Sequence, residues 1–342
     1  IVFGYNESQI GNRRETGNNR SGWDSAGRGL AMLRYSLRQL EYFSATAEKK
    51  SIAKAAKSLN ISQPSVSKAI TNLEAQFTTQ LFIRHHARGV SLTPAGERLL
   101  VDARGLLRYA GELQQHALSS SEGALGELEL ACFVTVAPIF MPALLADFSG
   151  RFPGIEIRLH EGNQDDLLAG LSSGRFELAL LYNLALPVDI DIDLLASFDP
   201  YVLLPEKHRL AKRKQISLEA LKDEPLILLD VPPSRDYFIS LFRAAGLEPQ
   251  VAFSSPSLEM VRGLVGRNQG YSLLVTHPYD DHTYDGQTIV TRPLADKTIT
   301  GDLGLARLAQ LRPSSAITVF AQFCKEWFVQ HHIDRGPCQA PI

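Results

Sequence analysis

Polar side chains that can form several hydrogen bonds are grouped in one short stretch of the chain. Gln63, Ser65 and Ser67 carry amide and hydroxyl groups, and Lys68 adds a cation. Amides and hydroxyls form hydrogen bonds with base edges in the major groove, and lysine suits a guanine edge or a phosphate. Each residue taken singly is most simply a solvated position on a helix. As a group they indicate a surface that contacts nucleic acid.

The residues around this group have the spacing of two short helices joined by a turn. Ser51 is a plausible N-cap of the first helix, and Ser62 of the second. Pro64 falls in the first turn of the second helix, where no backbone N–H is needed. The apolar positions of the first helix are Ile52, Ala55, Ala56 and Leu59. Those of the second, which we expect to be buried, are Val66, Ile70, Leu73 and Phe77.

A basic hairpin follows these helices. Residues 81–84 and 90–92 are predicted to form two strands around a tip of two histidines, Arg88 and a glycine. With an earlier helix through Leu40 and Phe43, the pattern predicts a winged helix-turn-helix. In such a module one helix enters the major groove and the hairpin contacts the backbone or minor groove. The predicted DNA contacts are Ser51, Ser62, Gln63, Pro64, Ser65, Ser67, Lys68, Asn72, Arg84 and Arg88.

The charge distribution agrees with a small DNA-binding module. Residues 33–92 hold nine Lys/Arg against three Asp/Glu, a balance of +6, within a chain of net charge −2. Residues 93–342 hold 22 against 31, a balance of −9. This asymmetry indicates that only the N-terminal module meets a polyanion.

A long helix is predicted to begin at Thr93 as cap and Pro94 as first residue. Six apolar residues within it recur at alternating spacings of four and three, which is a heptad seam. They are Leu99, Ala103, Leu106, Ala110, Leu113 and Ala117. The seam predicts pairing with the same helix of a second copy, and packing on its own domain is the alternative. The polar residues 119–123 that follow are predicted to be a hinge.

Beyond the hinge, predicted strands and helices alternate as far as residue 328. Repeating strand–helix units imply parallel sheets with helices on both faces. Ligands of such folds bind at the C-terminal ends of the strands, where helix N-termini point. The alternating acids of residues 189–193 read as a solvated face, with calcium binding as a minor alternative.

The N-terminal module resembles LysR-type transcriptional regulators. The most specific parts are "AAKSLNISQPSVSKAITNLE" and "LFIR…VSLTPAGE", and "FPGIEIRLHEGN" and "LPEKHRLA" resemble phrases of the family's effector domain. The resemblance covers nearly all of residues 34–330. It implies an α/β protein with an N-terminal winged helix-turn-helix, a long linker helix and a two-lobed periplasmic-binding-protein-like effector domain.

The resemblance also implies domain boundaries. The winged helix-turn-helix spans residues 33–92, the linker and dimerisation helix 93–122, and the effector domain 123–330. Within the last, lobe I comprises residues 126–196 and 292–330, and lobe II residues 197–291. Residues 1–32, polar and without periodicity, are expected to be a disordered or non-native extension, and 331–342 a tail.

The family holds its effector between the two lobes. Two hydroxyl residues often hold an effector carboxylate in the turn after the first strand; Thr135 matches one position, and Phe133 occupies the other. This departure favours a more apolar or aromatic ligand. A helix cap is the alternative role for Thr135, and a surface loop for His277. The expected effector contacts are Phe133, Thr135, Tyr182, Asn183, Ser254, Ser255, Ser257 and His277.

Several other functions find little support in the sequence. It contains no P-loop, GxSxG, HExxH or paired metal motif, so we expect no enzyme, no catalytic residue, no metal and no cofactor besides a co-inducer. A periplasmic solute-binding protein and a ligand-independent architectural protein are the alternatives. The three cysteines, Cys132, Cys324 and Cys338, are expected to be structural, with a redox switch as the alternative.

The expected partners follow from the family. They are double-stranded promoter DNA, a small-molecule effector of unknown identity, further copies of the chain in a dimer and a tetramer, and RNA polymerase. No apolar run approaches the ~20 residues of a membrane span, and no signal-peptide pattern opens the sequence. We therefore expect no membrane contact and a cytoplasmic location.

Overall fold

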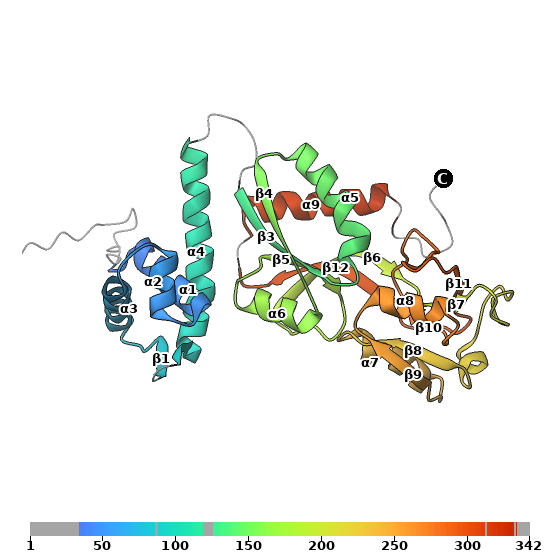
Figure 1. Ribbon diagram of the computed structural model, residues 1–342. Coiled ribbons are helices and arrows are strands. Elements are labelled where there is room, and N and C mark those ends of the chain that lie inside the picture. The colour runs from blue at the N-terminus through green and yellow to red at the C-terminus, as the bar shows by residue number, and fades with distance from the viewer. Residues whose placement is uncertain (1–33, 86–87, 119–125, 312, 332, 334–342) are drawn as a thin grey trace, which may run out of the picture.

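The computed structural model describes residues 34–85, 88–118, 126–311, 313–331 and 333. The expected N-terminal extension, the whole of the hinge and most of the tail thus lie outside the described residues. The first module consists of three helices and a two-stranded hairpin (Figure 1). These elements are α1 (Leu37–Lys49), α2 (Ile52–Ser58), α3 (Gln63–Phe77), β1 (Phe82–His85) and β2 (Gly89–Leu92).

The apolar stripes of α1, α2 and α3 form the core of this module. Phe43, Val66 and Leu73 are completely buried. Phe77 differs from the prediction: it is 36% exposed, and its ring lies 5.4 Å from that of Tyr35 at the edge of the module. The stripe therefore leaves the core in the last turn of α3.

Gly89, at the tip end of the hairpin, lies against the turn between α1 and α2. Its φ of +92° is one that residues with a Cβ rarely adopt. A Cβ added there would lie 2.3 Å from the carbonyl oxygen of Lys50, which accepts a hydrogen bond from the Val90 N–H at 3.0 Å. A glycine is thus required where the hairpin meets the helices.

The linker helix α4 (Pro94–Leu118) begins at the Thr93 hydroxyl, which accepts a hydrogen bond from the Gly96 N–H at 3.0 Å. Its N-terminal half completes the core of the first module: Ala103 is buried there and Leu99 is half-buried. Leu106 and Leu113 instead are 39% and 63% exposed. The predicted seam therefore has two parts: Leu99 and Ala103 pack on their own module, whereas Leu106 and Leu113 face outward.

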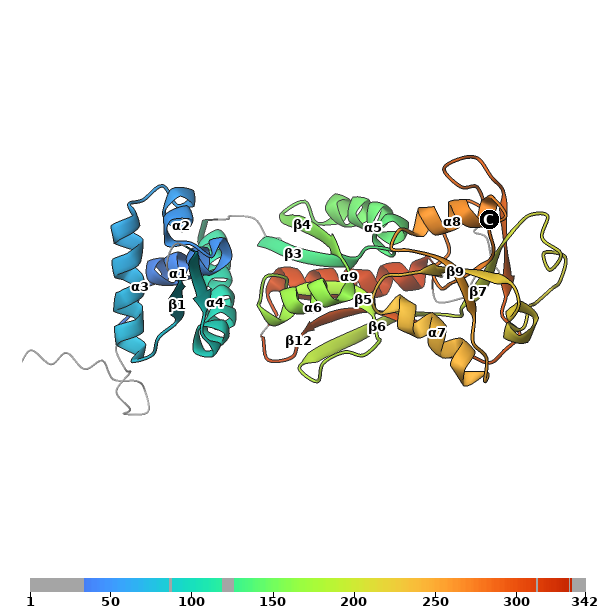
Figure 2. The same ribbon diagram turned by 60° about the horizontal axis from the view of Figure 1, so that its bottom comes forward.

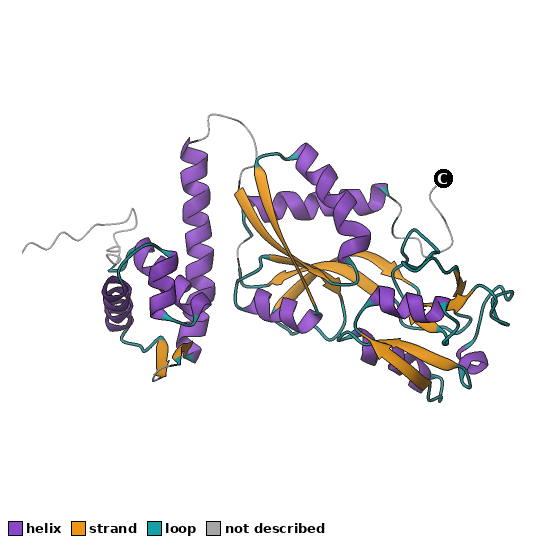
Figure 3. Cartoon of the chain, viewed as in Figure 1, coloured by secondary structure: helices purple, strands orange, loops and turns teal. Residues whose placement is uncertain are grey.

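The effector domain has two α/β lobes, and the first is built around a five-stranded sheet. Its strand order is β4-β3-β5-β12-β6; β3 is parallel to β4 and β5, whereas β12 is antiparallel to β5 and β6. Figure 3 shows helices packed against this sheet. Lobe I consists of β3 (Gly126–Phe133), α5 (Ala137–Arg151), β4 (Ile155–Gly162), α6 (Gln164–Ser172), β5 (Leu178–Tyr182), β6 (Ile190–Phe198), β12 (Gly301–Leu308) and α9 (Ser315–Gln330).

The second lobe is smaller and also mixed. β7 pairs antiparallel with β10 and β11, β8 pairs parallel with β9, and a bridge from Leu226 to Tyr271 joins the two groups. Lobe II consists of β7 (Tyr201–Pro205), η1 (Leu218–Leu221), β8 (Pro225–Leu229), α7 (Ser234–Ala244), β9 (Gln250–Ser255), α8 (Leu258–Gly266), β10 (Ser272–Leu274) and β11 (Ile289–Pro293).

Two sequence expectations about this domain were wrong in detail. The sheets are not purely parallel, because β12 returns through lobe I in the opposite direction to β5. The return to lobe I also comes later than residue 292, since β11 still pairs with β7 of lobe II and the lobe I strand begins at Gly301. Strand β9 escaped prediction because nearly all its residues are exposed, which removes the usual alternation.

The acidic segment of residues 189–193 leads into and begins β6, an edge strand. Two of its three carboxylates are partnered by cations: Asp191 lies 3.7 Å from Arg307 and Asp193 3.2 Å from Lys325. Among the described residues no group of three or more acids, histidines and cysteines has the geometry to hold a metal ion. Within the same residues, no helix has the length and apolarity needed to cross a membrane.

Candidate DNA interface and effector pocket

Helix α3 presents its polar face outward. Gln63, Ser65, Lys68 and Asn72 are exposed, on the face opposite the buried Val66 and its neighbours in the stripe. In both views of the molecule α3 lies on the outer side of the module, with α1 between it and α4 (Figure 2). Nothing else in the described chain covers this face, so a DNA groove has access to it.

The serines at the helix starts have a structural role. Ser62 Oγ accepts a hydrogen bond from the Ser65 N–H at 3.3 Å, and the two hydroxyl oxygens lie 2.7 Å apart. Ser51 Oγ accepts from the Lys54 N–H at 3.4 Å. These bonds satisfy N–H groups that a helix start leaves free. Ser67, half-exposed in the second turn of α3, and the exposed Pro64 lie at the same end.

The β1–β2 hairpin adds a basic edge to this surface. Arg84 and Arg88 are exposed on either side of the tip. His85 Nε2 lies 2.8 Å from Ser91 Oγ across the two strands, which orients the imidazole. The hairpin thus presents cations beside α3, as a wing that follows a phosphate backbone requires.

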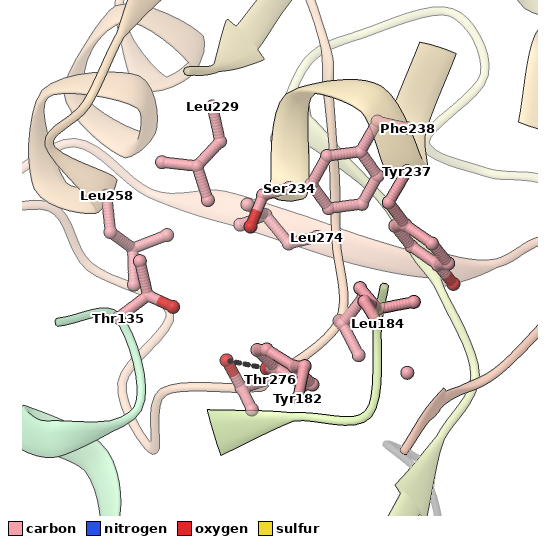
Figure 4. A pocket seen from close by; sticks show the side chains of 12 residues that line it. Thr135, Tyr182, Leu184, Leu229, Ser234, Tyr237, Phe238, Leu258, Leu274 and Thr276 are labelled. Carbon is pink, nitrogen blue, oxygen red and sulfur yellow. Dashed lines mark hydrogen bonds between the residues drawn. The ribbon is translucent and has the colours of Figure 1, made fainter. Parts of the chain in front are cut away.

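A pocket lies between the two lobes (Figure 4). Lobe I provides its wall from the turn after β3, the end of β5 and the start of β12, while lobe II provides the rest from α7, α8, β8 and the end of β10. The lining residues are Thr135, Tyr182, Leu184, Leu229, Ser234, Tyr237, Phe238, Leu258, Leu274, Val275, Thr276 and Gly301. Its volume is about 20 Å³, which is roughly the room one water molecule needs. The pocket is therefore nearly closed in this conformation.

The polar groups of the pocket are hydroxyls. Tyr182 donates to Thr276 Oγ1 at 3.4 Å across the lobes, and burial raises the pKa of its phenol. The Tyr237 hydroxyl donates to the Ile299 carbonyl, and burial likewise raises its pKa. Thr135 and Ser234 face the pocket from opposite lobes, and neither side chain forms a hydrogen bond with another described residue.

Two helices start at this pocket without a side-chain cap. α5 begins two residues after Thr135, and its N-cap residue is Val136; α7 begins at Ser234, and its N-cap residue is Pro233. Neither N-cap residue accepts a hydrogen bond through its side chain. Helix N-termini carry a partial positive charge, which favours an anionic ligand group. The N–H groups of Ile139, Ser234 and Arg235 already donate to backbone carbonyls, so the partial charge is the main attraction that these two helix starts offer.

The structure brings together only two of the eight residues expected at the effector site, Thr135 and Tyr182. Phe133 lies behind the wall, fully buried, with its ring 5.7 Å from that of Tyr182 and nearly perpendicular to it. Asn183 is exposed outside the lining, because β5 alternates and the side chain after Tyr182 points the other way.

The remaining expected residues are also placed elsewhere. Ser257 caps α8 by accepting from the Met260 N–H at 3.3 Å, and Ser255 Oγ accepts from the Ser257 N–H at 3.2 Å. Ser254 is exposed on β9. The ring of His277 lies against that of Tyr201, with centroids 4.6 Å apart and planes tilted by 31°. These residues support the end of lobe II rather than lining the pocket.

Sequence reasoning expected contacts from lobe II but missed the residues by which that lobe lines the pocket. Ser234, Tyr237 and Phe238 come from the first turns of α7, and Leu274 and Thr276 from the end of β10. The rule that ligands bind at strand ends, applied to β8 and β10, points to this region. The individual residues carried no motif of their own.

The two described cysteines, Cys132 and Cys324, are both buried and free. Burial raises the pKa of each thiol, so the reactive thiolate is scarce. Cys338 lies outside the described residues.

Comparison with known families decides the identity. Residues 37–97 match the family described as "Bacterial regulatory helix-turn-helix protein, lysR family", and residues 121–329 match the "LysR substrate binding domain". The chain belongs to the LysR family of transcriptional regulators. Its two matched regions coincide with the winged module and with the two lobes that enclose the pocket.

Similar LysR-family proteins cover most of the chain. An uncharacterized HTH-type transcriptional regulator, YvbU of Bacillus subtilis, is 30% identical over 85% of this chain and 98% of its own length. OxyR, a DNA-binding transcriptional dual regulator of Escherichia coli, is 32% identical over 70% of this chain and 78% of its own. Among solved structures, HinK, a LysR-family regulator of Pseudomonas aeruginosa, is 46% identical over 86% of this chain and 99% of its own, with a TM-score of 0.59.

A further solved structure contains DNA. Full-length CbnR complexed with its target DNA is 26% identical and covers 86% of this chain and 99% of its own, with a TM-score of 0.51.

Proposed function

We propose that this LysR-family chain binds promoter DNA as a dimer and that a compact ligand in the interlobe pocket regulates its activity. One observation carries the proposal: a winged helix-turn-helix with an uncovered polar face on α3 is joined in one chain to a pocket formed by two lobes. The CbnR complex with target DNA supports the DNA-binding part. We assign no reaction, metal or cofactor to the chain, and we place its action in the cytoplasm with the promoter.

The DNA contact is assigned to the start of α3 and to the wing. Gln63, Ser65 and Ser67 would read base edges in the major groove, whereas Arg84 and Arg88 would bind phosphates. Binding of the purified chain to the fragment upstream of its own gene, followed by fluorescence anisotropy, tests this assignment. Affinity should fall steeply with salt and exceed that for a random duplex. Equal affinity for both duplexes would refute sequence-specific recognition.

The lining defines the class of ligand. Six apolar side chains surround a few hydroxyls, and no charged side chain lines the pocket. The uncapped starts of α5 and α7 would receive one anionic or hydrogen-bonding group near Thr135 and Ser234. We therefore propose a small, largely apolar or aromatic molecule with one such group. Because the pocket has room for only about one water molecule, the lobes must separate to admit it.

A thermal-shift screen tests the ligand class. The panel pairs small aromatic and aliphatic carboxylates with their neutral amides, so that the contribution of the charge is measured directly. A true ligand raises the melting temperature of the parent and has a smaller effect on Thr135→Val and Ser234→Ala, which remove only hydroxyls. A control substitution on the far surface of lobe I, Arg151→Ala, should leave the shift unchanged. A shift that none of the pocket variants alters would place the ligand elsewhere.

Ligand binding would act on the DNA through the angle between the lobes. Opening the pocket shifts a pre-existing equilibrium between two lobe arrangements, and the coupling energy is typically ~1–3 kcal/mol. A change in lobe angle would alter the spacing of two recognition helices in a dimer, or of four in a tetramer. We also expect contact with RNA polymerase at the promoter. A footprint unchanged by a bound ligand would contradict this mechanism.

A response to peroxide is an alternative, because similar proteins of Dickeya chrysanthemi and Streptomyces viridosporus are named a hydrogen peroxide-inducible genes activator and a probable one. Cys132 and Cys324 do not favour it here, because both thiols are buried and have raised pKa values. A peroxide-reactive cysteine needs an accessible thiolate. The proposal therefore assigns sensing to the interlobe pocket.

A further inference from the structure

The linker helix meets lobe I on the side away from its exposed leucines. Arg104 Nη1 donates to the Ser173 carbonyl at 2.7 Å, and Arg108 Nη1 donates to the Gly174 carbonyl at 3.2 Å. Arg108 Nε also lies 2.9 Å from Glu177 Oε1. All three acceptors belong to the segment that joins α6 to β5. Two arginines one turn apart therefore bind one short loop of lobe I.

The acidic partner in this contact is buried. The Glu177 side chain is only 2% exposed, and that of Arg108 is 26% exposed. Glu177 Oε2 has no hydrogen-bond partner among the described residues. Burying a carboxylate without a cation costs much free energy. The contact with Arg108 offsets part of the cost of burying Glu177. Displacing α4 would leave that charge unpaired.

Among the described residues, few other contacts join the helix to lobe I. Val101 packs against the lobe's apolar core, and Gly105 faces Leu311. Beside this patch lies a cavity of about 790 Å³ lined by charged side chains of both signs, among them Arg108 and Glu177 of the contact itself and Glu129 of β3. The opposing signs of these residues make the cavity a poor site for one ion. The attachment of the helix thus depends mainly on the two arginines.

The same loop is continuous with the wall of the pocket. Glu177 immediately precedes β5, and β5 ends at Tyr182, which lines the pocket. The Glu177 N–H also donates to the Glu129 carbonyl of β3 at 3.0 Å, and β3 leads to Thr135 at the other end. Five residues of a strand span roughly 17 Å. Two parallel strands therefore have the linker contact at one end and the pocket at the other.

We propose that Arg104 and Arg108 are positioning residues: they clasp the linker helix to the loop before β5, and β3 and β5 couple this clasp to the pocket. The clasp sets where the DNA-binding module stands relative to lobe I. The clasp itself does not depend on the proposed function. The coupling does rest on it, because a change at the clasp through β3 and β5 requires a ligand that binds in the pocket.

Cross-linking measures the clasp without DNA or ligand. A Cβ built at Gly105 lies 3.7 Å from Leu311 Cδ2, so Gly105→Cys with Leu311→Cys places two thiols on either side of the contact. Cys338→Ser removes the one native cysteine outside the described residues, and a short bismaleimide joins the pair. The intramolecular product migrates as a monomer of altered mobility on a denaturing gel, whereas a link between copies doubles the mass.

The clasp predicts a ranking of cross-link yields. Arg104→Gln with Arg108→Gln should lower the yield several-fold. Glu177→Gln should lower it less, because an amide oxygen still accepts from Arg108. Arg98→Gln, an exposed arginine of the same helix, should leave it unchanged. A parent that does not cross-link, or arginine variants with the parent's yield and an unchanged circular dichroism spectrum, would overturn the clasp.

A second pair of variants tests the coupling. Tyr182→Ala and Tyr237→Ala both enlarge the pocket, but only Tyr182 lies on a strand that leads to the clasp. The first should change the cross-link yield and the second should not. Equal effects would refute the coupling and leave the clasp standing. Failure of the DNA-binding or ligand assays would refute the proposed function without altering either cross-linking result.

Discussion

The hydroxyl of Tyr182 in lobe I donates a hydrogen bond to Thr276 Oγ1 of lobe II at 3.4 Å. Both residues are buried and both line the pocket. The bond joins the two lobes within the lining of the pocket. Since its length is near the limit for a hydrogen bond, it opposes opening only weakly.

Tyr182→Phe removes this bond and changes little else. We expect the free energy of unfolding to fall by about 0.5–1.5 kcal/mol, at the lower end because of the long distance. Urea unfolding monitored by fluorescence measures the change. Tyr279→Phe, which alters a phenol that is 77% exposed, should have no effect. A Tyr182→Phe chain as stable as the parent would show that the bond does not hold the lobes together.

The DNA interface predicts different effects for helix and wing. Gln63→Ala should reduce the affinity for the specific duplex by about 5–150-fold, equivalent to 1–3 kcal/mol, with little change on random DNA. Arg88→Ala should weaken binding to both duplexes alike and reduce the salt slope by about 1. Anisotropy titrations on an operator and a shuffled duplex at several salt concentrations distinguish the effect of Gln63→Ala from that of Arg88→Ala.

A substitution far from the module provides the control for these titrations. Arg243→Ala, at an exposed position near the end of α7, should leave both affinities unchanged. An equal loss on specific and random duplex for Gln63→Ala would contradict its role in reading bases.

The first module was predictable from sequence because its determinants are local. Ser51 and Ser62 each cap a helix within three residues of themselves, and the buried stripes repeat every three to four residues. Phe77 was wrongly predicted to be buried. The apolar stripe shows which face of α3 packs inward, but it does not show how far along α3 the neighbouring helices extend. Tertiary packing determines how much of the stripe is buried, and the sequence period alone does not reveal it.

The pocket was predictable only in part because it joins distant segments. Thr135 and Tyr182 follow or end strands of lobe I, so a general rule about strand ends finds them. Ser234 and Tyr237 reach the same pocket only because the chain crosses to lobe II after β6 and returns at β12. That geometry depends on how the two sheets meet. The serines before α8 looked like ligand contacts, but their hydrogen bonds stabilise the start of the helix instead.

The exposed leucines of α4 predict a dimer through this helix. Leu106→Glu combined with Leu113→Glu would place two carboxylates in the apolar seam, so we expect the chain to become monomeric. Sedimentation velocity at several concentrations measures the mass. Val329→Glu on α9, which also introduces a charge at an exposed apolar position, should leave the mass unchanged. Double-glutamate chains that keep the parent's mass would show that α4 does not form the interface.

Glu177 predicts a pH dependence of stability. Burial raises the pKa of its carboxyl, and the nearby Arg108 offsets only part of this effect. The folded chain therefore binds this proton more tightly than the unfolded chain does, whose pKa is the ordinary value of about 4.3. Its contribution to stability is complete below that value and is lost as the pH rises through the raised pKa of the folded state.

The Glu177→Gln variant isolates this contribution, because the amide has nearly the same shape and does not ionise. Above the raised pKa, the variant should be more stable than the parent, and the difference should shrink towards zero as the pH is lowered to about 4. Thermal unfolding of both chains across this range measures the difference, with Glu326→Gln at an exposed site as a control. A difference that grows on acidification would mean that Arg108 outweighs burial and holds the pKa of Glu177 below its ordinary value.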